Sequence, residues 1–199
     1  GTVVHMSAGI AALCGAFFLG KRRKEFSDSE NIKPANIPFV ILGTSLLWFG
    51  WFGFNGFSQL AMGTFDDVNA IAKIAVNTHL AGAAGVVTGA ALTRLIGGKT
   101  DIIMMLNGAL AGLVAITAEP LTPTPITAML IGSVGSVIMY FGTKLLEHLR
   151  LDDVVGAIPV HLFAGIFGTL VVPFTNPDTS FGTQFLGTVS ICTFSFVFS

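Results

Sequence analysis

Residues 152–173 read DDVVGAIPVHLFAGIFGTLVVP, an apolar run that follows two aspartates. Inside this run His161 is the one titratable side chain. An ionisable group at membrane depth costs free energy, so an isolated histidine in such a run indicates a functional site with a polar partner. The stretch therefore predicts a membrane helix whose partner has to be found elsewhere in the chain.

A second apolar run with one histidine opens the chain. Residues 1–20 read GTVVHMSAGIAALCGAFFLG and contain His5. Residues 4–10 (VHMSAGI) and 160–166 (VHLFAGI) share Val, His, Ala, Gly and Ile at the same offsets. Small residues follow each histidine by three and four positions, on the same helix face, where they let another backbone or ring come close. The chain therefore contains an internal repeat centred on a histidine.

The composition of the 199 residues is that of a membrane protein. Hydrophobic residues make up 52% and charged residues 11%, and the mean hydropathy is +0.79. A soluble domain carries about 25% charged residues. We therefore expect an integral, multi-pass protein of the lipid bilayer. The net charge of −1 gives no reason to expect nucleic acid as a partner.

Seven apolar segments have the length that a bilayer requires, about 20 residues for a hydrocarbon core of roughly 30 Å. We expect helices because lipid-exposed strand edges would leave backbone polar groups unpaired. The predicted fold is therefore an all-α membrane protein. The predicted segments are residues 1–20, 37–60, 68–96, 102–118, 126–146, 154–172 and 181–199.

The loops between these segments predict their orientation. Nine of the ten lysines and arginines fall in alternate loops, including Arg23, Lys24 and Lys33 after the first segment, and the exception is Lys73. By the positive-inside rule the first segment runs outside to inside and the sixth runs inside to outside. The two histidine helices are thus predicted to be antiparallel, as in an inverted-topology repeat. The resulting depths permit His5 and His161 to meet near mid-membrane.

The second segment contains a dense aromatic motif, WFGWFGFNGFS, at residues 48–58. One interpretation is an interfacial aromatic belt with close-packing glycines. The other is a mouth that recognises a cation, because a ring face attracts an ammonium-like ion by about 0.5–2 kcal/mol and the hydroxyl of Ser58 can accept a hydrogen bond from it. Asn55 within the motif needs a polar partner on a neighbouring helix. The residues alone leave both interpretations open.

Other chemistries have little support in the sequence. There is no GxGxxG after a strand, no P-loop and no HExxH motif, and we expect no enzymatic activity, no metal and no cofactor. A redox protein with His5 and His161 as haem ligands is an alternative. For His79 a structural role, with interhelical hydrogen bonding, is favoured.

Five blocks of this sequence, in order, resemble the ammonium transporter (Amt/Mep/Rh) family, and the resemblance covers nearly the whole chain. The blocks are GTVVH at 1–5 with LGKR at 19–22, NIPF at 36–39 leading into GWFGFNG at 50–56, VNT at 76–78, NGALAGLVAIT at 107–117, and DD at 152–153 followed by VH at 160–161 and GIFGT at 165–169.

The resemblance implies an eleven-helix protomer, a homotrimer, and a pore between two inverted five-helix halves. Residues 1–199 would then be a partial transporter domain of about helices 5 to 11. Because the chain opens without an initiator methionine and closes inside an apolar run, we expect it to be a fragment truncated at both ends. The implied location is the plasma (inner) membrane, with a PII-type regulatory protein as a partner at the cytoplasmic face.

The resemblance also implies the site and the substrate, ammonium or ammonia. His5 and His161 match the family's twin-histidine pair in an apolar pore. Trp51 and Ser58 match positions at or near the outer recruitment site, and Phe54 matches a phenyl gate below it. Alternatives within the same fold are an ammonium sensor and an Rh-like channel for neutral gas.

Three residues near His161 depart from the family pattern. Pro159 stands shortly before it, and Leu162 and Phe163 follow it where the family has glycine. The proline is expected to bend the helix at the pore, and the two larger side chains are expected to narrow it.

Overall fold

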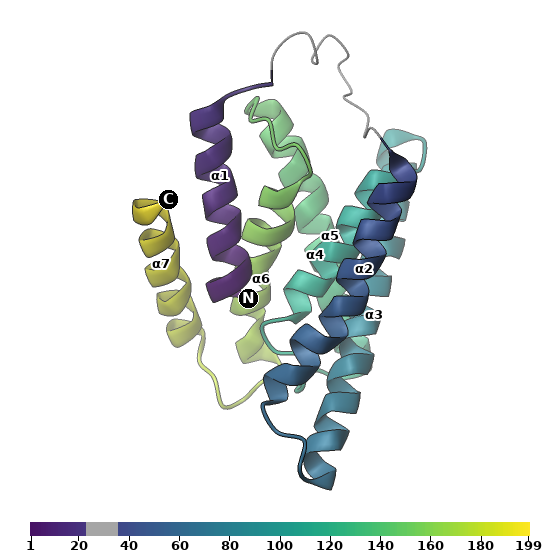
Figure 1. The fold of residues 1–199 in the computed structure, drawn as a ribbon, viewed down its shortest axis with the longest axis vertical. Helices are drawn as coiled ribbons and strands as arrows, with labels where there is room; N and C mark the ends of the chain where they lie inside the picture. Colours follow the sequence, from purple (N-terminus) through teal and green to yellow (C-terminus); the bar gives the residue numbers. More distant parts are fainter. Residues whose placement is uncertain (23–35) are drawn as a thin grey trace.

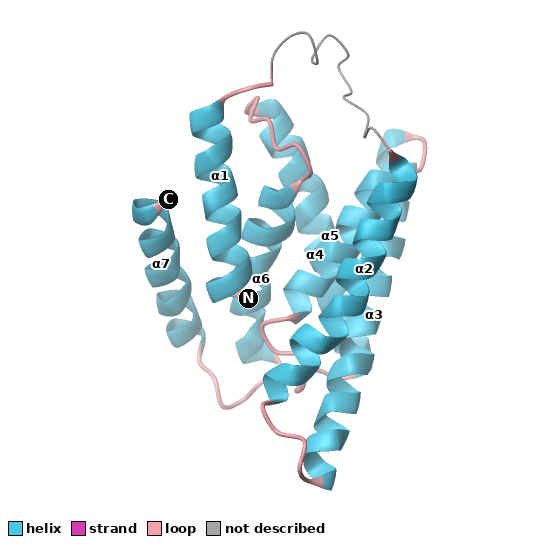
Figure 2. Ribbon diagram, in the orientation of Figure 1, coloured by secondary structure: helices cyan, strands magenta, loops and turns pink. Residues whose placement is uncertain are grey.

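The computed structural model describes residues 1–22 and 36–199, and their regular secondary structure is helical (Figures 1 and 2). Arg23, Lys24 and Lys33, on which part of the predicted orientation depends, lie outside the described residues. Each of the seven predicted segments contains a helix. The main helices are α1 (Ser7–Leu19), α2 (Ile37–Gly56), α3 (Phe65–Gly97), α4 (Ile102–Ile116), α5 (Pro125–His148), α6 (Ala164–Val171) and α7 (Phe181–Phe198).

Four short helices extend the main ones. Two are π-helical turns, η1 (Thr2–Met6) before α1 and η4 (Ile158–Phe163) before α6. Two are 3₁₀ turns, η3 (Phe57–Gln59) after α2 and η5 (Val172–Phe174) after α6.

Five of these helical segments are long and apolar enough to cross a membrane, and two apolar segments, Ile102–Ile116 and Ile158–Phe174, are shorter. The sixth segment begins at residue 158 rather than at the predicted 154, because Gly156 turns with a φ of 77° just before it. Pro159 therefore lies in the first turn, where its missing N–H would have no helical partner in any case. A proline in the first turn breaks no helical hydrogen bond, so the local backbone gives no cause for the bend predicted there.

Side-chain caps fix where the other long helices begin. An N-cap side chain accepts a hydrogen bond from one of the first free backbone N–H groups and so lowers the cost of starting the helix. The caps are Asn36 for α2, Thr64 for α3 with Asp67 completing a capping box, Asp101 for α4, Thr124 for α5 and Ser180 for α7.

Small residues bring α3, α4 and α5 into close contact. A methyl group on Gly108 of α4 would lie 2.6 Å from the carbonyl oxygen of Gly85 on α3. The same carbonyl accepts a 2.9 Å hydrogen bond from the buried hydroxyl of Ser136 on α5. In a membrane, helix association depends on such close van der Waals contact and interhelical hydrogen bonds, because lipid is as apolar as the helix surfaces.

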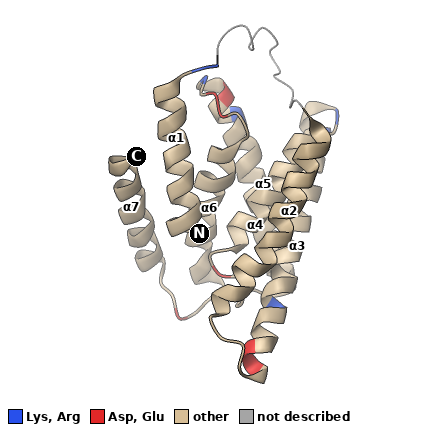
Figure 3. Ribbon diagram, in the orientation of Figure 1, with Lys and Arg blue, Asp and Glu red and all other residues tan. Residues whose placement is uncertain are grey.

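Beside this group, α1 lies next to the segment of η4 and α6, with α7 on its other side (Figure 1). The first residue, Gly1, approaches Thr169 near the end of α6, and Arg22 beyond α1 bonds to Asp152 before η4. The two histidine helices are therefore antiparallel, as predicted. Most of the described lysines and arginines gather at the end of the molecule where α1 ends and α2 begins (Figure 3).

Candidate functional site

The two repeat histidines are in contact. Nδ1 of His5 lies 3.2 Å from Nδ1 of His161, and the ring centroids are 5.3 Å apart with planes inclined by 14°. A hydrogen bond between these atoms requires that one ring carry a proton on Nδ1 and the other carry none there. Two residues separated by 156 positions thus share one proton across antiparallel helices.

Both histidines lie on π-helical turns, His5 in η1 and His161 in η4. Such turns are rare and occur frequently at functional sites, because the extra residue per turn changes the direction in which a side chain leaves the helix. The internal repeat seen in the sequence therefore extends to the local backbone.

Two aromatic rings of α2 pack against His5. Trp51 stacks on it with a centroid separation of 5.3 Å and planes inclined by 13°, and Phe54 lies at 5.7 Å with planes at 50°. The indole of Trp51 is fixed by a 2.8 Å hydrogen bond to Thr117 Oγ1, which in turn donates to the carbonyl of Leu113 at 2.6 Å. The imidazoles thus continue a stack of rings that α2 and α4 hold in place.

The structure separates the three residues of the predicted mouth. Trp51 is 7% exposed and lies against the histidine pair, not beyond it, whereas Phe54 is 44% exposed. Ser58 follows in η3, and its hydroxyl donates to the carbonyl of Phe54 at 2.8 Å. Trp51 and Phe54 are therefore brought together with His5, and Ser58 lies one helical turn further along the chain.

One nitrogen of the pair has free hydrogen-bonding capacity. Nε2 of His5 is buried and has no partner among the described residues. A buried polar atom without a partner costs about 1–3 kcal/mol, so a small molecule that donates or accepts a hydrogen bond there would be favoured. The arrangement can thus bind a small polar group and move a proton between two rings.

The large side chains beside His161 pack away from the pair. Leu162 is 6% exposed and lies in an apolar cluster with Met6 and Leu146, and Phe163 packs against that cluster and against Gly142 of α5. The volume of both side chains is thus taken up by contacts with α1 and α5, and the narrowing of a passage at the histidines stays a prediction.

The sequence predicted that Asn55 has a polar partner on a neighbouring helix, and it donates to Thr78 Oγ1 of α3 at 3.0 Å. His79 is exposed and lies 5.6 Å from Trp48 and 6.1 Å from Phe52, measured between ring centroids. The structure thus places it outside the histidine pair.

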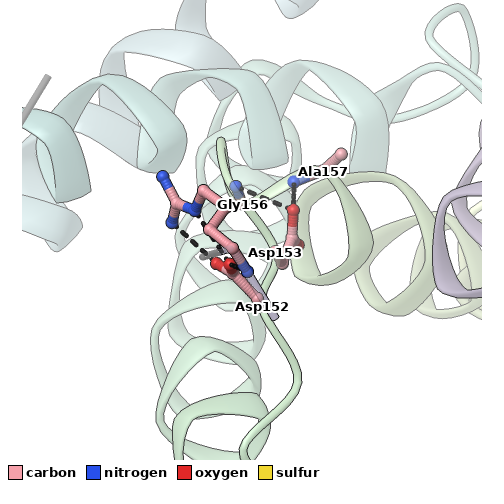
Figure 4. Close-up of polar contacts among 5 residues, drawn as sticks. Asp152, Asp153, Gly156 and Ala157 are labelled. Carbon is pink, nitrogen blue, oxygen red and sulfur yellow. Dashed lines mark hydrogen bonds and ion pairs between the residues drawn. The ribbon is translucent and has the colours of Figure 1, made fainter. Parts of the chain in front are cut away.

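Two aspartates hold the start of the His161 helix (Figure 4). Asp153 accepts hydrogen bonds from the backbone N–H groups of Gly156, Ala157 and Ile158, at 3.1, 3.0 and 2.7 Å. Sequence reasoning had not assigned these residues a role, although an acidic residue shortly before an apolar run is a usual signal for a helix start.

Asp152 joins this start to the end of α1. Its carboxylate accepts from Nε and Nη2 of Arg22 at 2.8 and 2.6 Å and from the backbone N–H of Arg22 at 2.9 Å. These hydrogen bonds from Arg22, and its positive charge, hold the pKa of Asp152 below its ordinary value. The ends of the two histidine helices are thus tied together by a bidentate ion pair.

Within the described ranges, no group of three or more potential metal-ligating side chains comes together. The histidine contact also leaves no room for an iron between the rings, because two opposed metal–nitrogen bonds of about 2 Å need about 4 Å and the measured separation is 3.2 Å. The geometry therefore argues against the haem alternative.

Comparison with known proteins gives consistent matches. The sequence model described as the Ammonium Transporter Family matches residues 1–195. Ammonium transporter Amt2 of Archaeoglobus fulgidus is 44% identical over 173 residues, which cover 85% of this chain and 36% of that protein. Ammonium transporter 3 of Dictyostelium discoideum is 35% identical over 191 residues, which cover 89% of this chain and 44% of that protein.

Solved structures agree. A protein named Sensor Amt Protein superposes with a TM-score of 0.89 at 32% identity, over 99% of this chain and 51% of its own. Mep2 of Candida albicans superposes with a TM-score of 0.84 at 28% identity, over 98% of this chain and 46% of its own. The chain thus spans about half the length, or less, of these proteins.

Proposed function

This chain belongs to the Ammonium Transporter Family, and on that premise we propose that it forms part of a pathway for ammonium or ammonia across a membrane, centred on His5 and His161. The observation that carries the proposal is the 3.2 Å contact between their Nδ1 atoms, with His5 buried and Trp51 stacked against it. A pair of histidines in this setting suits a substrate that is itself a proton carrier.

The chemistry of the substrate explains this arrangement. Ammonium is strongly hydrated, so it loses much of its solvation free energy on entering an apolar passage, whereas neutral ammonia loses far less. A neutral imidazole has one donor and one acceptor nitrogen, and two in contact can pass a proton without either holding a charge for long. In this proposal Nε2 of His5 accepts the proton of ammonium as ammonia moves on, the proton on Nδ1 of His5 passes to Nδ1 of His161, and His161 releases the proton on its own Nε2.

The aromatic residues have different roles in this proposal. Phe54 is the gate, because its ring covers His5 from the partly exposed side. The buried Trp51, stacked on His5, holds that imidazole in orientation. Ser58 recruits ammonium by accepting a hydrogen bond through a lone pair that its bond to the Phe54 carbonyl leaves free.

Further proposals concern the whole protein. We propose that the described helices are about helices 5 to 11 of an eleven-helix fold; the chain spans 36% of Amt2 and 51% of the sensor structure, which supports its being part of a longer transporter domain. The complete protein is then a homotrimer in the plasma membrane with a PII-type regulatory partner at the cytoplasmic face. It acts as a channel or transporter and not as an enzyme.

A second candidate is an ammonium sensor, in which the same fold binds ammonium with little flux and passes the signal to another domain. The similarity to a structure named Sensor Amt Protein favours it. Ammonium flux into proteoliposomes that contain only the full-length protein separates the candidates. Flux that saturates with ammonium supports transport, and ammonium binding without flux supports the sensor. A response to pH gradients with no charge movement indicates the Rh-like variant for neutral gas.

The test of the site is His161→Ala in the full-length protein. We expect the ammonium-selective current across a planar bilayer or proteoliposome to disappear or to change its ion selectivity. His79→Ala is the matched control, because that histidine is in the same protein but exposed on α3, and it is expected to leave transport unchanged. Ammonium-selective transport of normal size in the His161 variant would refute the role assigned to the pair.

A further inference from the structure

The internal repeat also determines how the two histidine helices touch. Each copy places a glycine four residues after its histidine, Gly9 in α1 and Gly165 in α6. Each also places a large side chain directly after it, Met6 and Leu162. In the folded chain these residues pair across the repeat, with Gly9 against Leu162 and Gly165 against Met6.

The two contacts are not equal. A methyl group on Gly9 would lie 2.6 Å from Cβ and 2.7 Å from Cα of Leu162 and would overlap its backbone nitrogen. A methyl group on Gly165 would lie 3.4 Å from the backbone nitrogen of Met6 and 3.5 Å from Cβ of His5, which is ordinary van der Waals contact. The helices are therefore in full backbone contact at Gly9 and have room for a methyl group at Gly165.

We propose that Gly9 is a positioning residue that sets the separation of His5 and His161. Leu162 follows His161 directly in the chain, so any displacement of its backbone moves the imidazole of His161. The effect of Gly9 on transport rests on the function proposed above. Its effect on the distance between the two imidazoles does not depend on that function.

The size of the effect follows from the contact distances. The carbon of a methyl group on Gly9 would lie 2.6 Å from Leu162 Cβ, whereas two non-bonded carbon atoms need a separation of about 3.4 Å. The helices therefore have to move apart by about 0.8 Å. A shift of that size along the line between the rings takes the Nδ1 separation from 3.2 Å to about 4 Å, which is beyond hydrogen-bond distance.

Leu162 has little space into which it can retreat. Its side chain is 6% exposed and packs with Ile10, Leu146 and the fully buried Met6. Protein interiors are close-packed, so such a cluster transmits a displacement instead of absorbing it. The added methyl group would therefore move the backbone that carries His161.

The experiment compares Gly9→Ala with Gly165→Ala in the full-length protein, reconstituted in lipid with ¹⁵N-labelled histidine. Solid-state NMR detects the coupling between two ring nitrogens that share a hydrogen bond, and size-exclusion chromatography reports whether the assembly is intact. We expect Gly9→Ala to lose the coupling and to lower ammonium transport by about tenfold or more, since a misplacement of about 1 Å can cost up to 100-fold in rate. We expect Gly165→Ala to keep the coupling and to transport within about twofold of the parent.

The outcomes distinguish this inference from the function on which it rests. Retention of the coupling in an assembled Gly9→Ala protein overturns the inference. If the coupling disappears and transport is unchanged, the inference stands and the proposed role of the histidine pair fails.

Leu162→Ala covers the case in which the Gly9 variant does not assemble. That change opens a cavity in the same cluster but leaves the backbone of residue 162 against Gly9, so the coupling is expected to persist. Its loss would show that side-chain packing, and not the approach at Gly9, sets the contact, and would overturn the inference.

Discussion

Replacing Asp153 with alanine removes the carboxylate that accepts hydrogen bonds from the backbone N–H groups at the start of the His161 helix. This side chain accepts hydrogen bonds from the backbone N–H groups of Gly156, Ala157 and Ile158, the last at 2.7 Å. Without it those three donors face water or remain unpaired, and the first turn of η4 frays. His161 lies three residues after Ile158, so fraying reaches the histidine directly.

The structure allows an estimate of the cost. A hydrogen bond to a charged group contributes about 1.5–3 kcal/mol, and the Asp153 carboxylate accepts three at and just before the first residue of η4, so we expect its removal to cost about 2 kcal/mol. Asp153→Asn keeps one acceptor oxygen for Gly156 and Ala157 and loses the bond to Ile158, which costs about 1 kcal/mol.

The appropriate assay is backbone hydrogen exchange, followed by mass spectrometry, on the full-length protein in detergent or lipid. A local loss of about 2 kcal/mol raises the exchange of the amides of residue 158 and residues 160–163 by roughly 30-fold, and the asparagine variant falls between the alanine variant and the parent. Exchange in α3 is expected to stay the same, because α3 begins at its own cap, Thr64.

Asp66→Ala is the matched control, since it also removes an acidic side chain near the start of a helix, but Asp66 is exposed in the first turn of α3 and far from η4 in the chain. It is expected to leave exchange at 158–163 unchanged. Parent-like protection of these amides in the Asp153→Ala protein would refute the role assigned to Asp153. An equal rise in exchange in every helix would also refute it, because the effect would then be global.

Three further predictions concern the elements around the histidine pair. Thr117→Val leaves the buried N–H of Trp51 without its 2.8 Å acceptor and is expected to cost about 1–3 kcal/mol of stability, measured by thermal unfolding in detergent; an unchanged midpoint would contradict the hydrogen bond. Arg22→Gln removes the ion pair with Asp152, which is partly exposed and therefore contributes no more than about 1 kcal/mol. Because Arg22 lowers the pKa of Asp152 in the folded state, the substitution lowers the stability by its full amount above about pH 4. This difference in stability disappears as the pH falls through the lowered pKa, and a difference of equal size at low pH would contradict the linkage. Gly85→Ala places a methyl group into a backbone carbonyl of α4, so the full-length protein is expected not to assemble, as size-exclusion chromatography would show; normal assembly would disprove the close packing of α3 and α4.

Much of this fold could be predicted from the sequence because its signals are local. Apolar runs of membrane length predict the seven helical segments. Basic residues in alternate loops predict that the two histidine helices are antiparallel. Matching offsets around His5 and His161 identified the repeat. The predicted start of the sixth segment is four residues too early, since the turn at Gly156 and the hydrogen bonds that Asp153 accepts replace the helix that hydropathy alone predicts.

The tertiary structure decided which helix faces meet. In α1 and α2 nearly every side chain is apolar, and exposed positions such as Phe17, Phe18 and Phe49 are as hydrophobic as the buried ones. Lipid is as apolar as a helix interface, so hydropathy in a membrane does not indicate which side of a helix is inward. The stacking of Trp51 on His5 and the approach of Gly9 to Leu162 depend on how the helices are rotated and how closely they cross, and residues far apart in the chain determine both.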